Sequence, residues 1–264
     1  MGRLDGKVAI VTGASSGMGE AITKRFAKEG ATVLAIARRK EKLQGVIDEI
    51  TAQGGKAVAV SGDVTNQADV ENVVKTAVEQ YGKLDIVVNN AGLMDNMAPV
   101  ERIPDEMFDN VIDVNLKGPF RMFRAAIPAM LKNPDNPKYP AGFGKGAFVT
   151  VASVGGLRGA ISGPAYTASK HGVVGLAKNV AFMYAKKGIR SNIIAPGGVA
   201  TEMAAAMTGW DPEGVGICTS GNAECNPRTG APGEIAELAL FLASDESSLI
   251  NGATVTADAG WCAQ

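Results

Sequence analysis

The segment Val8-Ala-Ile-Val-Thr-Gly-Ala-Ser-Ser-Gly-Met-Gly19 begins as an apolar run and continues as a glycine-rich stretch. Val8 to Val11 has the unbroken apolar character of a strand buried on both faces, as in a parallel sheet. Beyond the glycines, apolar residues recur every four positions and predict a helix that ends at Gly30. The segment therefore predicts a strand, a tight turn and a helix, which together begin a βαβ unit.

The same alternation of strand and helix continues to the end of the chain. We expect long helices over 107–131 and 165–187. Further strands are expected at 33–37, 57–60, 84–88, 147–151, 189–195 and 253–257. Helices that connect parallel strands cover both faces of the sheet. The predicted fold class is therefore α/β, a doubly wound, Rossmann-type parallel sheet of about seven strands with helices on both faces, in one domain over 1–264.

Two long irregular stretches interrupt this alternation, at 133–146 and 199–230. The first precedes a strand and should lie at the amino-terminal edge of the sheet. The second follows a strand and should lie at the carboxyl edge, where open α/β sheets bind their ligands. We therefore interpret 199–230 as a substrate lid.

Composition excludes several classes of function. The chain has 264 residues with 26 basic and 27 acidic side chains, so nothing in its net charge of −1 attracts nucleic acid. No apolar run is long enough for a membrane span. Three cysteines without metal-ligand spacing predict no metal site and favour a reducing, cytoplasmic location.

The glycine-rich turn predicts a dinucleotide site, because a helix amino terminus attracts phosphate and glycine lets the backbone approach it. Its G-x-x-x-G-x-G spacing departs from the common G-x-G-x-x-G fingerprint, and a purely structural turn is the alternative. The contacts expected here are Gly13, Ser15, Ser16, Gly17, Met18 and Gly19.

The end of the second strand bears on the choice of cofactor. NAD sites often carry an acid there for the ribose 2′-OH, but this strand ends in Arg38 and Arg39. Guanidinium groups suit a 2′-phosphate, and the Ser15 hydroxyl offers another contact. The sequence therefore favours NADP(H), with NAD(H) possible if the arginines are ordinary solvated charges.

Tyr166 and Lys170 are four residues apart and share one face of a predicted helix. A nearby ammonium stabilises a phenolate, which suits Tyr166 to proton transfer. Ser153 follows the fifth strand, where its hydroxyl could hold a carbonyl oxygen. The Y-x-x-x-K pattern alone is common, and a buried tyrosine beside a solvated lysine is the alternative.

Together with other motifs, these residues resemble the short-chain dehydrogenase/reductase family, single-domain type, over essentially the whole chain. Residues 12–19 resemble the family's TGxxxGxG loop, and Asn89 to Gly92 match its NNAG motif. The resemblance implies the catalytic set Asn115, Ser153, Tyr166 and Lys170. It adds as cofactor contacts Asp63, Val64, Asn90, Ala91, Gly92, Tyr166, Lys170, Pro196, Gly197, Val199 and Thr201. It also implies that Lys170 binds the nicotinamide ribose, that Asn115 supports a water, and that the protein is a homotetramer.

The sequence constrains the identity of the substrate less than that of the cofactor. An apolar pocket is expected from Met94, Leu157, Met203 and Met207, together with Ser153. The lid carries four acids, Glu202, Asp211, Glu213 and Glu224, against Arg228. That acidic rim favours a neutral, fairly apolar ketone or secondary alcohol, steroid-like for example, over a 3-oxoacyl thioester of acyl carrier protein or coenzyme A. A non-catalytic dinucleotide sensor is a third alternative.

Overall fold

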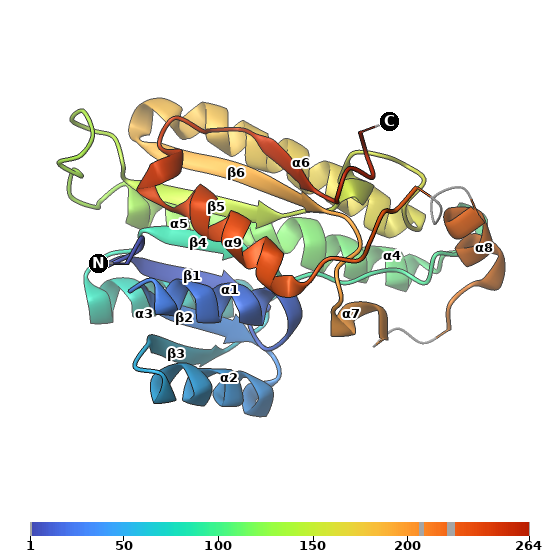
Figure 1. Ribbon diagram of the computed structural model, residues 1–264, viewed down its shortest axis with the longest axis horizontal. Coiled ribbons are helices and arrows are strands. Elements are labelled where there is room, and N and C mark those ends of the chain that lie inside the picture. Colours follow the sequence, from blue (N-terminus) through green and yellow to red (C-terminus); the bar gives the residue numbers. More distant parts are fainter. Residues whose placement is uncertain (1, 206–208, 221–224, 264) are drawn as a thin grey trace.

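The computed structural model describes residues 2–205, 209–220 and 225–263. Within these ranges, seven parallel strands form one sheet in the order β3-β2-β1-β4-β5-β6-β7. The strands are β1 (Val8–Thr12), β2 (Thr32–Ala37), β3 (Lys56–Ser61), β4 (Ile86–Asn89), β5 (Gly146–Val151), β6 (Ile189–Pro196) and β7 (Thr254–Ala257). The predicted doubly wound α/β fold is confirmed (Figure 1).

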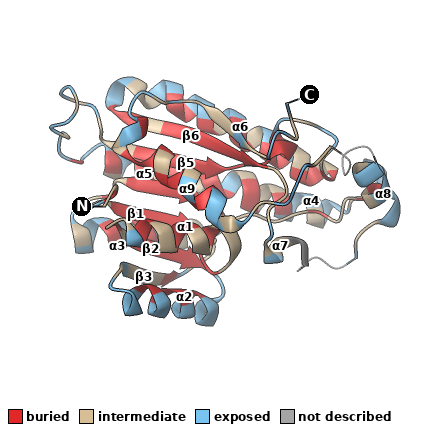
Figure 2. Cartoon of the chain, viewed as in Figure 1, coloured by how far each residue is buried: buried red, intermediate tan, exposed pale blue. Residues whose placement is uncertain are grey.

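Helices cover both faces of this sheet. One face carries α1 (Gly17–Lys28), α2 (Lys40–Ala52) and α9 (Pro232–Ala243), and the other carries α3 (Gln67–Tyr81), α5 (Gly118–Met130) and α6 (Pro164–Tyr184). The strand β1 shows why its sequence is apolar throughout: Ala9 and Val11 pack into one core, and Val8 and Ile10 into the other. Figure 2 shows the buried residues concentrated in the strands and on the inner sides of the helices.

The helix expected over 107–131 is instead divided. It consists of α4 (Asp105–Ile112), a π-helical stretch at Asp113–Lys117, and α5. Pro119 lacks an N–H group, so an unbroken α-helical hydrogen-bond ladder is impossible there. Wide π turns are frequent at functional sites, and this one contains Asn115.

The two irregular stretches lie at opposite edges of the sheet, as expected. Asn133 anchors 133–146 at the amino-terminal edge, where its side chain bonds to the backbone of Leu84 and Lys145. The stretch 199–230 at the carboxyl edge is not wholly irregular, because it contains α7 (Glu202–Ala205) and α8 (Pro212–Ser220). None of the described helices is both long and apolar enough to cross a membrane.

Strand order sets the position of the site. The chain runs outward from β1 to β2 and β3, and then returns to place β4 on the other side of β1. The loops that follow β1 and β4 therefore diverge at the carboxyl edge, which opens a crevice between them.

Candidate active site

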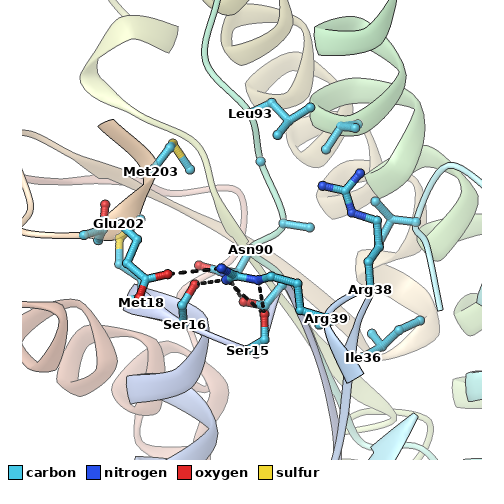
Figure 3. A pocket seen from close by; sticks show the side chains of 18 of the residues that line it. Ser15, Ser16, Met18, Ile36, Arg38, Arg39, Asn90, Leu93, Glu202 and Met203 are labelled. Carbon is cyan, nitrogen blue, oxygen red and sulfur yellow. Dashed lines mark hydrogen bonds and ion pairs between the residues drawn. The ribbon is translucent and has the colours of Figure 1, made fainter. Parts of the chain in front are cut away.

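A cavity of about 330 Å³ lies at this switch point. Its walls come from the glycine-rich turn, the ends of β2 and β3, the loop after β4, and α7 (Figure 3). Of the residues expected to contact cofactor or substrate, it is lined by Gly13, Ser15, Ser16, Gly17, Met18, Arg38, Arg39, Asp63, Val64, Asn90, Ala91, Gly92, Met94, Thr201 and Met203. The structure thus brings together residues that are far apart in the sequence.

Other expected contacts lie outside this lining. Gly19 lies behind it, where an added Cβ would stand 2.2 Å from the Gly13 carbonyl oxygen. Val199 lines a second cavity of about 470 Å³ beside the C-terminal segment. Pro196 ends β6, and an added Cβ on Gly197 would stand 2.9 Å from the Asp258 Cβ. The residues that the sequence reasoning did not assign to the cavity are Ile36, Ala37, Gly62, Leu93, Val114 and Glu202.

The glycine-rich turn has the geometry of a phosphate cradle. Gly13 and Gly17 adopt φ angles of 66° and 58°, and an added Cβ on Gly13 would stand 2.9 Å from the Ala91 Cα. The Ser16 side chain makes no capping hydrogen bond to α1, so the first N–H groups of this helix face the cavity without a side-chain cap. Among the described residues, the buried Oδ1 of Asn90 also has no hydrogen-bond partner. These features fit a bound dinucleotide.

The two arginines at the end of β2 differ in position. Arg39 Nη2 donates to the Ser16 Oγ at 2.5 Å and to the Ser15 Oγ at 3.2 Å. Arg38 instead lies with its Nη1 3.8 Å from the Asp63 Oδ2. Figure 3 shows the Arg39 guanidinium between the serines and Glu202, and Arg38 extending away from them. Arg39 is therefore the arginine that faces the phosphate cradle.

Ser153 and Tyr166 form the polar centre of the expected catalytic set. Ser153 follows β5 and its hydroxyl accepts a hydrogen bond from Gly155 N at 3.0 Å. Burial raises the pKa of the Tyr166 phenol above its ordinary value, a hydrogen bond with Ser153 opposes that rise, and the Asp95 charge adds to it. Tyr166 is therefore protonated at neutral pH and is poised as a proton donor.

Lys170 is 4% exposed and lies over the Tyr166 ring, with 5.4 Å between Nζ and the ring centroid. It donates a hydrogen bond to the Val151 carbonyl oxygen at 3.1 Å. Burial lowers the pKa of this ammonium from 10.5 to about 8. At neutral pH the group is still largely charged, so a positive charge stands beside the tyrosine.

Asn115 ties the loop after β4 to α6. Its Oδ1 accepts from Leu93 N at 2.8 Å, and its Nδ2 donates to the Leu93 carbonyl at 2.8 Å and to the Ser169 Oγ at 3.0 Å. An added Cβ on Gly92 would stand 3.4 Å from the Asn115 Oδ1 and 3.5 Å from the Lys170 Nζ. Asn115 and Lys170 therefore both lie beside Gly92.

Asp95 is a site residue that the sequence reasoning missed. It is fully buried, and its carboxylate accepts hydrogen bonds from Met97 N at 3.1 Å and Tyr166 N at 2.9 Å. It thereby satisfies an N–H group in the first turn of α6 from another loop, as a capping residue does. Its position just after the NNAG motif was the available signal, but its partner lies 71 positions away.

For the described acids of 199–230, the expected argument from an acidic rim to substrate charge is wrong. Glu202 pairs with Arg39 and Lys42, while Asp211 and Glu213 both pair with Arg102. These cations come from outside 199–230 and compensate the three carboxylates. Two other expected lid residues, Met207 and Glu224, lie outside the described residues.

The described members of the expected apolar pocket lie at the carboxyl edge. Met94 and Met203 line the cavity, and the Met203 Cε would stand 3.7 Å from a Cβ on Gly92. Leu157 is 38% exposed and follows the turn that begins at Ser153. An apolar surface therefore adjoins the polar centre.

Residues 7–212 match the family model described as short chain dehydrogenase. Among curated proteins, 3beta-hydroxysteroid dehydrogenase 2 of Eggerthella lenta is 40% identical, covering 98% of this chain and 96% of its own. A 3-oxoacyl-acyl-carrier-protein reductase of Thermotoga maritima is 38% identical, covering 98% of each chain.

Solved structures agree with these sequence relatives. A Beutenbergia cavernae protein described as an NAD(P)-dependent gluconate 5-dehydrogenase, with NADP bound at low occupancy, has a TM-score of 0.84. It is 36% identical and covers 99% of this chain and 98% of its own. Levodione reductase has a TM-score of 0.87 at 34% identity, covering 98% of this chain and 99% of its own. The chain therefore belongs to the short-chain dehydrogenase/reductase family and is an oxidoreductase that acts on hydroxyl and carbonyl groups.

Proposed function

We propose that this protein is an NADP(H)-dependent oxidoreductase that interconverts a fairly apolar ketone and its secondary alcohol, with Tyr166 as general acid and base. The observation that carries the proposal is the buried Tyr166 phenol, hydrogen-bonded with Ser153 and lying beneath the Lys170 ammonium. A non-catalytic sensor has no need for a buried lysine held beside a buried phenol, because both groups are costly to bury.

Each polar side chain has a part in the proposed mechanism. In reduction, Tyr166 gives its proton to the carbonyl oxygen, and Ser153 donates a hydrogen bond that stabilises the developing charge. Lys170 would hold the nicotinamide ribose, its positive charge would stabilise the phenolate that forms when Tyr166 gives up its proton, and Asn115 would support a water that returns a proton to Lys170. When bound, the nicotinamide cofactor supplies or accepts the hydride.

Arg39 supports the preference for NADP(H). Its contacts with Ser15 and Ser16 gather three groups that can donate to a 2′-phosphate. Ala37 at the end of β2 and Arg38 just after it offer no carboxylate for the 2′-OH that NAD(H) carries. The Beutenbergia cavernae relative with bound NADP agrees with this preference.

The apolar surface from Met94 and Met203 supports a steroid-like ketone or alcohol, as does the 3beta-hydroxysteroid dehydrogenase of Eggerthella lenta. A 3-oxoacyl thioester is the second candidate, favoured by the Thermotoga maritima relative. Because the described acids of 199–230, Glu202, Asp211 and Glu213, are paired with cations, their charges do not argue against that anionic substrate.

The proposal extends to the organisation of the protein. We propose that 1–264 is one dinucleotide-binding and catalytic domain with 199–230 as its substrate lid, in a cytoplasmic homotetramer without nucleic-acid or membrane partners. Phe120 on α5 and Phe182 on α6 are 45% and 83% exposed, which supports an interface along these two helices. Sedimentation equilibrium tests the tetramer.

One screen tests the proposed activity. Ketosteroids, small apolar ketones and a 3-oxoacyl coenzyme A are each offered with NADPH and with NADH, and oxidation of the cofactor is followed by absorbance. The proposal expects the highest kcat/KM for an apolar ketone with NADPH. Preference for the thioester would favour the second candidate, and no turnover of any carbonyl would contradict the proposal.

A further inference from the structure

The carboxylate of Glu202 forms an ion pair with Arg39, the arginine beside the glycine-rich turn. Its Oε2 lies 3.1 Å from the Arg39 Nη1 and 3.1 Å from the Lys42 Nζ, and its Oε1 lies 3.2 Å from the same Lys42 Nζ. Glu202 lines the cavity together with Ser15 and Ser16, which contact the other side of the Arg39 guanidinium (Figure 3).

The neighbours of Glu202, Thr201 and Met203, also line the cavity. An added Cβ on Gly17 would stand 3.2 Å from the Thr201 Cγ2, and one on Gly92 would stand 3.7 Å from the Met203 Cε. The residues on either side of Glu202 therefore contact opposite walls. The Glu202 side chain between them is 55% exposed, and its carboxylate pairs with Arg39 and Lys42, which are themselves about half exposed.

A 2′-phosphate and this carboxylate require the same partners. The phosphate carries nearly two negative charges at neutral pH and three strong acceptor oxygens. Hydrogen bonds from Lys42 and then Arg39 lower the pKa of Glu202, so its carboxylate is charged at neutral pH. Two anions beside the same cations repel each other, so the phosphate and the carboxylate compete for Arg39 and Lys42.

We propose that Glu202 is a specificity-determining residue for the cofactor, acting as a built-in competitor of the 2′-phosphate. Binding of NADP(H) displaces the carboxylate from Arg39 and Lys42, whereas NAD(H), with a free 2′-OH, leaves both ion pairs in place. Glu202 thus reduces the advantage that Arg39 gives to the phosphorylated cofactor. This inference rests on the proposed contact between Arg39 and the 2′-phosphate.

The test compares Glu202→Gln with Glu213→Gln. Both changes remove one lid carboxylate that pairs with arginine, but Glu213 pairs with Arg102 and does not line the cavity. Dissociation constants for NADPH and NADH are measured without substrate, from the fluorescence of the reduced nicotinamide. Glu202→Gln should bind NADPH about threefold to tenfold more tightly, as expected from two exposed ion pairs, and NADH within about twofold of wild type. Glu213→Gln should change neither constant.

Arg39→Ala separates this inference from the proposed cofactor preference. If Arg39→Ala weakens NADPH binding while Glu202→Gln leaves it unchanged or weaker, the preference stands and the competitor role is overturned. If Glu202→Gln lowered the dissociation constants for NADPH and NADH by the same factor, the competitor role would also be overturned, because the effect would not depend on the 2′-phosphate. If Arg39→Ala leaves NADPH binding unchanged, the phosphate contact is wrong and the competitor role fails with it.

Discussion

The buried carboxylate of Asp95 accepts a hydrogen bond from the backbone N–H of Tyr166 at 2.9 Å. The loop after β4 therefore holds the first turn of the helix that carries Tyr166. The same carboxylate also accepts from Met97 N within its own loop. One side chain thus ties the backbone at Tyr166 to the loop after β4.

Replacing Asp95 should destabilise the protein. Asp95→Asn leaves one acceptor oxygen for two N–H groups, and an unsatisfied buried donor costs about 1–3 kcal/mol. Urea denaturation should show a loss of that size in the free energy of unfolding. The exposed Asp109 on α4 is the matched control, since Asp109→Asn should cost less than about 0.5 kcal/mol. Equal stability of the two variants would contradict the anchoring role.

Tyr166→Phe should remove the proton donor while leaving the cavity intact. We expect kcat to fall by about 10²–10⁴-fold, the usual contribution of general acid–base catalysis, with the dissociation constant of NADPH within about twofold of wild type. Tyr139→Phe is the control, because the Tyr139 hydroxyl contacts Asp245 and not the cavity. Residual turnover comparable to that of Tyr139→Phe would show that Tyr166 is not the acid.

Ser153→Ala should move the pH profile of alcohol oxidation. In the proposed mechanism oxidation requires the Tyr166 phenolate, so kcat/KM should rise as pH passes through the pKa of the phenol. The Ser153 hydrogen bond lowers that pKa against the effect of burial, and its loss should shift the rising limb to higher pH. Ser153→Thr keeps a hydroxyl and should leave the limb in place. A shift in the opposite direction would refute the assigned role.

Lys170 should make the stability of the free protein depend on pH. Burial lowers its pKa from 10.5 to about 8. Below about pH 8 the ammonium is charged in both folded and unfolded chains, and its burial costs stability in full. Between pH 8 and 10.5 only the unfolded chain keeps the proton, so that cost disappears as pH rises.

Lys170→Met removes the cost at every pH. Wild type should gain stability as pH rises from about 8 to 10.5, whereas Lys170→Met should not. The free energy of unfolding of Lys170→Met minus that of wild type, measured by urea denaturation, should therefore fall over this range. Lys178→Met, at an exposed position of the same helix, should show no such trend. A difference between Lys170→Met and wild type that stays constant across this range would contradict the buried-ammonium argument.

The two arginines at the end of β2 should have unequal effects on cofactor selection. Arg39→Ala should lower the ratio of kcat/KM for NADPH over NADH by about tenfold or more, because it removes charge-assisted hydrogen bonds to the 2′-phosphate. Arg38→Ala should lower it less, since Arg38 lies towards Asp63 and away from the serines. A larger loss in Arg38→Ala would reverse this assignment.

The sequence by itself determined the features that depend on neighbours in the chain. Continuous apolar runs such as Val8–Val11 specify strands buried on both faces, because each successive side chain must point into one of two cores. The glycines at 13 and 17 take positive φ angles that a side chain would oppose. Tyr166 and Lys170 share a helix face because of the helical period alone.

Only the tertiary structure decided which distant groups meet. The pairs Asp95–Tyr166 and Glu202–Arg39 are separated by 71 and 163 positions, and each forms because a loop returns to the carboxyl edge of the sheet. Counting the acids of 199–230 predicted an acidic rim, but the fold brings cations from the turn after β2, from α2 and from the loop after β4 to the described carboxylates. Ion pairing depends on separations of a few ångströms, and such separations follow from the packing of whole elements, which no local pattern in the sequence encodes.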